Sequence, residues 1–382
     1  MRIRAASLED WLRDYYFTAE IDISSSGVES YSMAQVREMT GLRHDEIDAL
    51  VFDDGYSLGF PAVRQAIADR WGDGDPRKVM TTSGSSEAIT LVLSALLEPG
   101  DEVVVVEPGY HALVQYAQWL GCSTVTWRLD VDAGFRPSLV ELAELVTGRT
   151  RAIIVNFPQN PTGVSISEPE LRRLVEVAVS AGAYLLWDAA FAELTYETDP
   201  LPDVSVCYER GIGFGTFSKV FGLPGLRFGW CLAPPDVLTE CVRIRDYTTL
   251  HVSPMIELLA LRVLGNAKAF IEPRRQRAAA NRDLLGSWAK AQPDRVSLHL
   301  PDGGVAAFPR LLGIADTYEF CDQLFSSRGV LVIPGSCFGA PEHIRVGFGG
   351  PSVALADGLD RLSAALADLS GPSASTVECA AW

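Results

Sequence analysis

Lys219 is the residue of this sequence best placed to do covalent chemistry. It follows the apolar segment Gly211–Phe217 in the run Thr216-Phe217-Ser218-Lys219. A lysine amine on such a turn can form a Schiff base with an aldehyde if burial or nearby cations keep part of it deprotonated. Arg227 offers a planar fork suited to a phosphate, and the hydroxyls of Thr216 and Ser218 add donors. The alternative, an ordinary solvated lysine and arginine, fits poorly with a segment that is otherwise apolar.

Polar side chains also end two other apolar segments. Asp188 follows Tyr184–Trp187, and a carboxylate buried there needs a cationic or N–H partner. A protonated pyridine nitrogen would meet that need, and a helix N-cap is the alternative. Asn156 and Asn160 come directly after Ile153–Val155. Their amides could bind a ligand, or they could belong to the simple turn that Asn-Pro and Thr-Gly pairs favour.

Small hydroxyl residues and one aromatic ring precede two expected helices. Ser85 and Ser86 stand where a helix begins. The free N–H groups of a helix N-terminus favour a phosphate, although serines are equally good plain N-caps. Tyr110 follows the apolar run Val103–Val106 and could either stack on a planar ring or belong to the core.

The elements that must position these residues alternate along the chain. Short apolar runs of buried-strand type are separated by amphipathic segments at 86–97, 110–120, 137–145 and 168–181. This alternation predicts an α/β fold with a mostly parallel central sheet and helices on both faces. Ligands bind such sheets beyond the carboxyl ends of the strands, where Lys219, Asp188 and Asn160 are expected.

The pattern changes after about residue 255. Helical stretches at 255–269 and 274–292 precede strand-like runs at 305–308 and 330–333. We therefore expect a large domain at 46–254, a smaller α+β domain formed by 1–45 with 255–370, and a flexible tail at 371–382.

The composition excludes several classes of function. The chain has 382 residues, a net charge of −17 and no apolar run long enough to span a bilayer or form a signal core. An acidic protein of this kind is not expected to bind nucleic acid or a membrane. Its seven cysteines include no CxxC pair and predict neither a metal site nor a disulfide framework. We expect a cytoplasmic protein.

Together these motifs resemble the class I/II aminotransferase family, fold type I of the pyridoxal-phosphate (PLP) enzymes. Tyr56, Gly59 and 64–67 are similar to the family's early element, and 334–349, with Arg345, to its C-terminal element. The order and spacing of the motifs over nearly the whole chain make the resemblance specific.

The resemblance implies PLP as cofactor and a role for each matching residue. Lys219 would carry the cofactor and move the Cα proton of the substrate. Asp188 would pair with the pyridine nitrogen, Asn160 would bind the phenolic oxygen and Tyr110 would stack on the ring. The phosphate would be bound by Ser85, Ser86, Thr216, Ser218 and Arg227.

The resemblance also implies a substrate and an assembly. Arg345 would bind the α-carboxylate of an amino-acid substrate, with Gly27 beside it. Tyr56 would reach the phosphate of a neighbouring subunit, so a homodimer with shared sites is implied.

Phe191 departs from the family pattern, which has a tyrosine three residues after the aspartate. Without that hydroxyl the phenolic oxygen loses a donor, which puts ordinary transamination in doubt. Together with the segments 22–28, 185–191, 218–230 and 243–254, Phe191 makes the chain similar to a smaller group, the capreomycidine synthase-type cyclases of streptothricin-type antibiotic pathways. That group dehydrates and cyclises 3-hydroxylated arginine.

Three functions remain open from the sequence: a PLP cyclase, a PLP aminotransferase and a non-catalytic binding module. Departure of a hydroxyl needs a general acid, for which Lys219 or Ser25 could serve. A substrate guanidinium needs acceptors, for which Glu29 and Asp246 are candidates, although both could be solvated surface charges. His111 and His251 are weaker candidates, because a lone histidine is more often structural.

Overall fold

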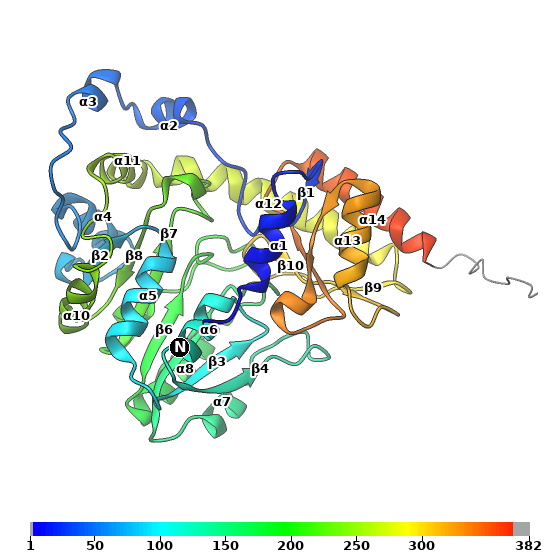
Figure 1. The fold of residues 1–382 in the computed structure, drawn as a ribbon, viewed down its shortest axis with the longest axis horizontal. Helices are drawn as coiled ribbons and strands as arrows, with labels where there is room; N and C mark the ends of the chain where they lie inside the picture. The colour runs from blue at the N-terminus through cyan, green and yellow to red at the C-terminus, as the bar shows by residue number, and fades with distance from the viewer. Residues whose placement is uncertain (1–2, 370–382) are drawn as a thin grey trace, which may run out of the picture.

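A seven-stranded sheet forms the centre of the molecule, in the order β2-β8-β7-β6-β5-β3-β4 (Figure 1). Its strands are β2 (Val79–Thr82), β3 (Glu102–Glu107), β4 (Ser123–Arg128), β5 (Thr150–Asn156), β6 (Tyr184–Asp188), β7 (Gly211–Thr216) and β8 (Gly229–Leu232). Strand β8 is antiparallel to both neighbours, and the other pairs are parallel. The predicted mostly parallel α/β sheet is confirmed.

Both faces of the sheet are buried, which explains why the strands read as continuous apolar runs. In β3, Val103 and Val105 join one core cluster and Val104 and Val106 the other. Helices α5 (Ser85–Leu96), α6 (His111–Trp119) and α10 (Pro235–Arg245) contribute to the first cluster. Helices α4 (Pro61–Trp71), α7 (Leu139–Leu145), α8 (Glu168–Ala181) and α9 (Val204–Cys207) contribute to the second.

The strand register brings the polar residues to the same end of the sheet. Asn156 pairs with Asp188 across β5 and β6, and Asp188 pairs with Phe214 across β6 and β7. These residues lie at the carboxyl ends of neighbouring parallel strands, where ligands bind in open α/β sheets.

A second group of elements follows β8. Its helices are α11 (Pro254–Leu264), α12 (Ala267–Lys290), α13 (Tyr318–Arg328) and α14 (Ser352–Asp368). Its strands are β9 (Val296–Ser297), β10 (Ala306–Ala307), β11 (Arg310–Leu311), β12 (Val330–Leu331), β13 (Ile333–Pro334) and β14 (Ile344–Gly347). Strands β10, β14 and β13 form a small antiparallel sheet. Short 3-10 helices are η1 (Pro76–Lys78), η2 (Pro224–Leu226) and η3 (Gly335–Phe338).

The helix boundaries expected in this region were wrong. The break falls at Gly265 and Asn266, and α12 continues through Pro273. A proline inside a helix is unfavourable. Buried side chains on both sides of it, including Phe270 and Arg274, hold the helix by tertiary packing.

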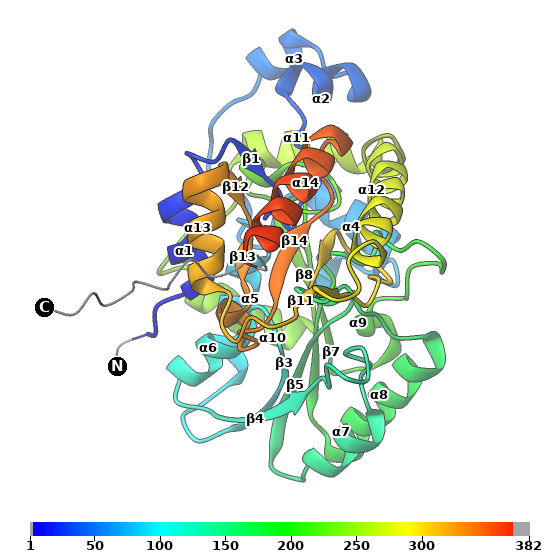
Figure 2. The same cartoon turned by 90° about the vertical axis from the view of Figure 1, so that its right-hand side faces the viewer.

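The N-terminal segment contacts both groups of elements. Strand β1 (Ile21–Asp22) pairs with β12, and the Trp11 ring nitrogen on α1 (Ser7–Tyr15) donates to the Val332 carbonyl at 2.9 Å. Helices α2 (Met33–Thr40) and α3 (His44–Asp48) lie at the periphery, as Figures 1 and 2 both show, where α2 packs against α11 and Glu46 on α3 is ion-paired with Arg262. The proposed domain limits stay a prediction.

The computed structural model describes residues 3–369, so the tail predicted at 371–382 lies outside the described residues. Within the described range, no helix is both long and apolar enough to cross a membrane.

Candidate active site

An open cavity of about 1360 Å³ lies at the carboxyl edge of the sheet. It brings together most of the residues singled out from the sequence: Ser85, Ser86, Tyr110, Asn160, Asp188, Phe191, Thr216, Ser218, Lys219, Arg227 and Arg345. These residues come from four strand ends, two helix starts and the C-terminal sheet, which only the folded chain places side by side.

Lys219 is a half-buried lysine whose amine has one hydrogen-bond partner among the described residues. Its Nζ donates to Ser26 Oγ at 2.9 Å. Burial lowers the pKa of Lys219 to about 8, and the positive charge of Arg345 acts in the same direction. About a tenth of the amine is therefore uncharged at pH 7, far more than for an ordinary lysine, and this fraction can act as a nucleophile or base.

Asp188 is a buried carboxylate that lacks a strong cationic partner among the described residues. Its Oδ1 accepts from the Ala190 N–H at 3.1 Å. Burial raises the pKa of Asp188 to about 6, a rise that the Ala190 hydrogen bond and the charge of Lys219 oppose. Asn156 fixes the strand end by donating to the Asp188 carbonyl at 2.7 Å. The carboxylate is thus prepared to receive a cation from a bound molecule.

Arg345 lies on β14 of the small antiparallel sheet, and its buried guanidinium lines the cavity. Its Nη2 donates to the Ser24 carbonyl at 2.9 Å, and its Nη1 donates to Asn160 Oδ1 at 3.2 Å. Burial lowers the pKa of Arg345 to about 10, so it stays protonated at neutral pH. A buried, protonated fork with no carboxylate partner in the described structure can bind an external carboxylate.

A cluster of hydroxyls and one guanidinium lies around the turn after β7. The Ser218 Oγ accepts from Arg227 Nη1 at 3.3 Å and lies 3.0 Å from Thr216 Oγ1. Arg227 adopts a left-handed backbone, with φ of 54°, which an arginine rarely adopts without support. A Cβ at Gly84 would lie 2.6 Å from Arg227 Nη2, so the glycine is required for the guanidinium to approach the start of α5.

Aromatic and imidazole rings are among the residues that line the cavity. Burial raises the pKa of Tyr110 to about 12, so its phenol stays protonated. Phe191 is buried and presents no hydroxyl to the cavity. His111 also lines the cavity, and its Nδ1 is buried without a partner among the described residues.

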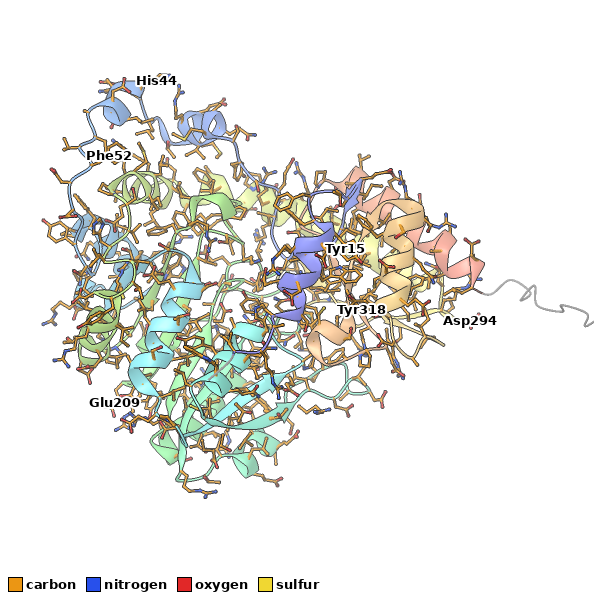
Figure 3. All side chains as sticks on the ribbon, in the orientation of Figure 1. Tyr15, His44, Phe52, Glu209, Asp294 and Tyr318 are labelled. Atoms are coloured by element: carbon orange, nitrogen blue, oxygen red, sulfur yellow. The ribbon has the colours of Figure 1, made fainter. Side chains whose placement is uncertain are left out.

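Three predicted residues do not line this cavity. Ser25 and Gly27 line an adjoining hollow of about 840 Å³ that Lys219 also borders. Tyr56 is 58% exposed on the loop after α3. The nearby side chain of Phe52 points outward on the same extended segment (Figure 3).

The two carboxylates suggested for a guanidinium are not free in the cavity. Glu29 lies in the adjoining hollow and is ion-paired with Arg274 and Arg277. Asp246 is exposed at the end of α10 and does not line the cavity. The alternative of ordinary structural charges therefore describes both better.

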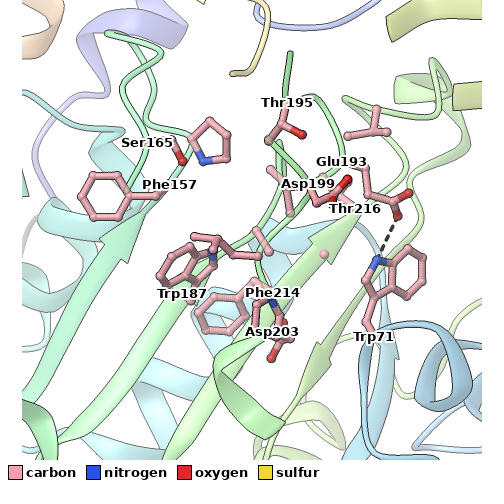
Figure 4. Close-up of a pocket in the computed structure, with 18 of the residues that line it drawn as sticks. Trp71, Phe157, Ser165, Trp187, Glu193, Thr195, Asp199, Asp203, Phe214 and Thr216 are labelled. Atoms are coloured by element: carbon pink, nitrogen blue, oxygen red, sulfur yellow. Dashed lines mark hydrogen bonds between the residues drawn. The ribbon is translucent and has the colours of Figure 1, made fainter. Parts of the chain in front are cut away.

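Figure 4 shows another cavity, of about 720 Å³, behind the carboxyl ends of β6 and β7. Its carboxylates include Asp203, which accepts from Ser205 N–H at 2.9 Å, and Glu193, which accepts from Trp71 Nε1 at 2.9 Å. No lysine, arginine or histidine lines it in the part of the chain that the structure describes. It is therefore unsuited to a phosphate or a carboxylate.

The geometry of the cavity around Lys219 agrees with the protein family that the sequence matches. Residues 55–362 match the family model described as aminotransferase class I and II. The chain belongs to this family.

Two members of the aminotransferase family show where the chain lies within it. It is 44% identical over 361 residues to capreomycidine synthase of Streptomyces vinaceus, covering 94% of this chain and 93% of that protein. It is 29% identical to the aspartate aminotransferase of Thermotoga maritima, covering 80% and 81%.

Among solved structures, that of the PLP-dependent cyclase OrfR has a TM-score of 0.92 and 41% identity, with 97% of this chain and 98% of that chain covered. A PLP-dependent aminotransferase from Streptococcus suis also has a TM-score of 0.92, at 28% identity, covering 96% and 99%.

PLP is the cofactor of this aminotransferase-family chain, and the cavity fits it. The aldehyde of PLP corresponds to the lysine amine, and its pyridine nitrogen to the buried carboxylate that lacks a strong cationic partner. Its phosphate corresponds to the cluster of one guanidinium and several hydroxyls. The side chains that would hold these three groups are Lys219, Asp188 and Arg227, the last with Thr216 and Ser218.

Sequence reasoning missed two polar residues of the cavity. Ser26, which bonds to Lys219, stands between the predicted Ser25 and Gly27, so only the backbone conformation decides which serine faces the lysine. Glu9, on α1, also lines the cavity, and no motif surrounds it in the sequence. Its position depends on how α1 packs.

Proposed function

We propose that the chain is a PLP-dependent cyclase that converts a 3-hydroxylated L-arginine to a capreomycidine-type cyclic guanidino amino acid in antibiotic biosynthesis. The observation that carries the proposal is the 44% identity to capreomycidine synthase over almost all of both chains. The phenylalanine at 191 also supports it, because the tyrosine expected of ordinary transaminases is absent from the cavity.

Each residue of the cavity has a separate role in this reaction. Bound PLP supplies an aldehyde that condenses with amines and a ring that stabilises negative charge at the substrate Cα. Arg345 binds the α-carboxylate, and the Asp188 carboxylate holds a proton on the pyridine nitrogen. Lys219 Nζ removes the Cα proton and later returns a proton to the same carbon.

The bond changes at the substrate Cβ add up to the loss of one water molecule. The Cβ–O bond breaks, and the hydroxyl leaves with a proton as water. A guanidine nitrogen then forms a bond to Cβ and loses a proton, which Lys219 Nζ accepts and delivers to Cα. Lys219, protonated after it has taken the Cα proton, is the nearest acid, and Ser26 orients its Nζ.

The proposal includes a homodimer with shared sites. Tyr56 lies on an exposed loop outside its own cavity, as expected for a residue that serves a neighbouring subunit. The exposed apolar side chains Val51 and Phe52 on the same segment support burial against another copy.

The test is incubation of the PLP-loaded enzyme with 3-hydroxyarginine in heavy water, followed by mass spectrometry of the product. We expect a product lighter by one water, with deuterium at Cα and no need for a keto-acid acceptor. Lys219→Ala should abolish both changes. Formation of a keto acid only when an acceptor is present would support instead the second candidate, an aminotransferase, which family membership favours.

A further inference from the structure

The side chain of the proposed substrate needs a binding partner that the catalytic residues do not provide. An arginine derivative brings a guanidinium, which stays charged in proteins and needs carboxylate or carbonyl acceptors when it leaves water. The cavity already contains Lys219, Arg227 and Arg345. A further cation is therefore disfavoured unless a negative group faces it.

Two carboxylates line the described cavity, Asp188 and Glu9. Asp188 is buried at the end of β6 and is committed to the cofactor by the function proposed above. Glu9 is exposed to the cavity on α1, and the described structure gives its carboxylate no hydrogen bond or ion pair. Its neighbour Asp10, by contrast, is paired with Arg13 at 2.6 Å on the same helix.

The charge of Glu9 acts on the groups around the cavity. Burial is the main cause of the raised pKa of Tyr110, and Glu9 adds to it; burial lowers the pKa values of Lys219 and Arg345, and Glu9 opposes that fall. It also opposes the fall that burial causes in the pKa of His111. The carboxylate therefore faces the same space as the residues that bind the substrate's carboxylate and amine.

Helix α1 holds Glu9 in place. Leu8 and Leu12, on the same helix, also line the cavity, and Trp11 is buried with its ring nitrogen bonded to the Val332 carbonyl. Tyr15 donates to Asp322 Oδ1 on α13 at 2.6 Å. The rings of Tyr15 and Tyr318, both labelled near α1 and α13 in Figure 3, each contact the Trp11 ring. The helix thus presents one carboxylate and two apolar side chains to the cavity.

We infer that Glu9 is the residue that selects a guanidinium side chain, binding the distal cation of the substrate while Arg345 binds its α-carboxylate. The inference rests on the proposed function and deepens it. Leu8 and Leu12 would contact the methylene stem between the two charged ends. His111 also lines the cavity, and its Nδ1, which has no partner in the described structure, would add an acceptor while the ring is neutral.

The experiment measures binding, separately from turnover. L-Arginine and uncharged L-norleucine are titrated into the PLP-loaded enzyme and followed by visible absorbance, because neither carries the hydroxyl that must leave. Glu9→Gln keeps the size of the side chain and removes its charge. We expect it to weaken L-arginine binding by about 10- to 100-fold, as loss of a charged hydrogen bond does, and to leave L-norleucine binding unchanged.

Matched variants show whether the effect belongs to the carboxylate of Glu9 itself. Asp10→Asn, one residue away, should change neither affinity, and Glu9→Asp should recover part of the preference for arginine. Circular dichroism checks that α1 stays folded. Unchanged L-arginine affinity in Glu9→Gln would overturn the inference, as would loss of that affinity in Asp22→Asn alone, because Asp22 lines the adjoining hollow.

The wild-type enzyme separates this inference from the proposed function. If it binds L-arginine no better than L-norleucine, the arginine-cyclase function and the role of Glu9 fail together. If it cyclises 3-hydroxyarginine and Glu9→Gln retains arginine affinity, the function stands and the role of Glu9 alone fails.

Discussion

At the scale of single residues, the hydrogen bond from Lys219 to Ser26 leads to a prediction about how readily the amine loses its proton. The Lys219 Nζ donates to Ser26 Oγ, so Ser26→Ala removes an acceptor that stabilises the protonated amine. We expect the pKa of Lys219 to fall below its value of about 8. Labelling of Lys219 by an amine reagent in cofactor-free protein should then reach its half-maximal rate at lower pH.

Ser25→Ala is the control for that prediction, because Ser25 faces the adjoining hollow. Its labelling profile should match the wild type. Equal profiles for all three proteins would show that the serine hydroxyl does not influence the lysine.

Asp188 supports a second prediction, which depends on its charge. Asp188→Asn keeps an oxygen that can accept from the Ala190 N–H but cannot hold a proton on a pyridine nitrogen. We expect turnover to fall by at least about 100-fold, the scale of a lost acid–base partner. The phosphate residues are intact in this variant, so the visible absorbance of bound PLP should remain.

Asp203→Asn is the matched control for Asp188→Asn. Burial raises the pKa of Asp203 to about 6 as well, but its carboxylate lines the cavity of Figure 4, away from Lys219. Turnover measured at saturating substrate should stay near the wild-type value. An equal loss of turnover in both variants would mean that removing a buried charge lowers activity by destabilising the fold.

At the scale of elements, we expect the start of α5 and the turn after β7 to bind the cofactor phosphate together. Gly84→Ala would place a Cβ 2.6 Å from Arg227 Nη2, at a residue whose φ is +81°. We expect weaker PLP binding, measured by absorbance titration of the cofactor-free protein.

Gly100→Ala separates the clash from the backbone strain. Gly100 has a φ of +95°, and nothing lies within 4 Å of its Cβ position. Both variants should lose about 1–2 kcal/mol of unfolding free energy from left-handed backbone strain. If Gly100→Ala also weakened PLP binding, close packing at Gly84 would not be the cause.

The same elements show which parts of the fold could be predicted from sequence. Asp188 and Lys219 follow apolar runs, so the local pattern places both at strand ends. Ser26 bonds to a lysine 193 residues away, and Glu9 depends on the docking of α1, so neither contact leaves a local signal. The continuation of α12 through Pro273 was missed for the same reason, because tertiary packing overrides local preference there.

At the scale of the whole molecule, the proposed homodimer predicts that one chain does not complete its own site. Tyr56 is 58% exposed and lies outside the cavity that binds the cofactor. If it serves a neighbouring subunit, two inactive variants can restore each other. The variants are Lys219→Ala, which keeps Tyr56, and Tyr56→Ala, which keeps Lys219.

In a mixed dimer, one site lacks both residues and the other has both. Random exchange of subunits at equal concentrations makes half of the dimers mixed, each with one complete site, so we expect about a quarter of wild-type activity. The measurement is turnover after the two variants are unfolded and refolded together, compared with the same variants refolded separately. If Tyr56 acted in its own subunit, every site in the mixture would lack one of the two residues, and mixing would restore nothing.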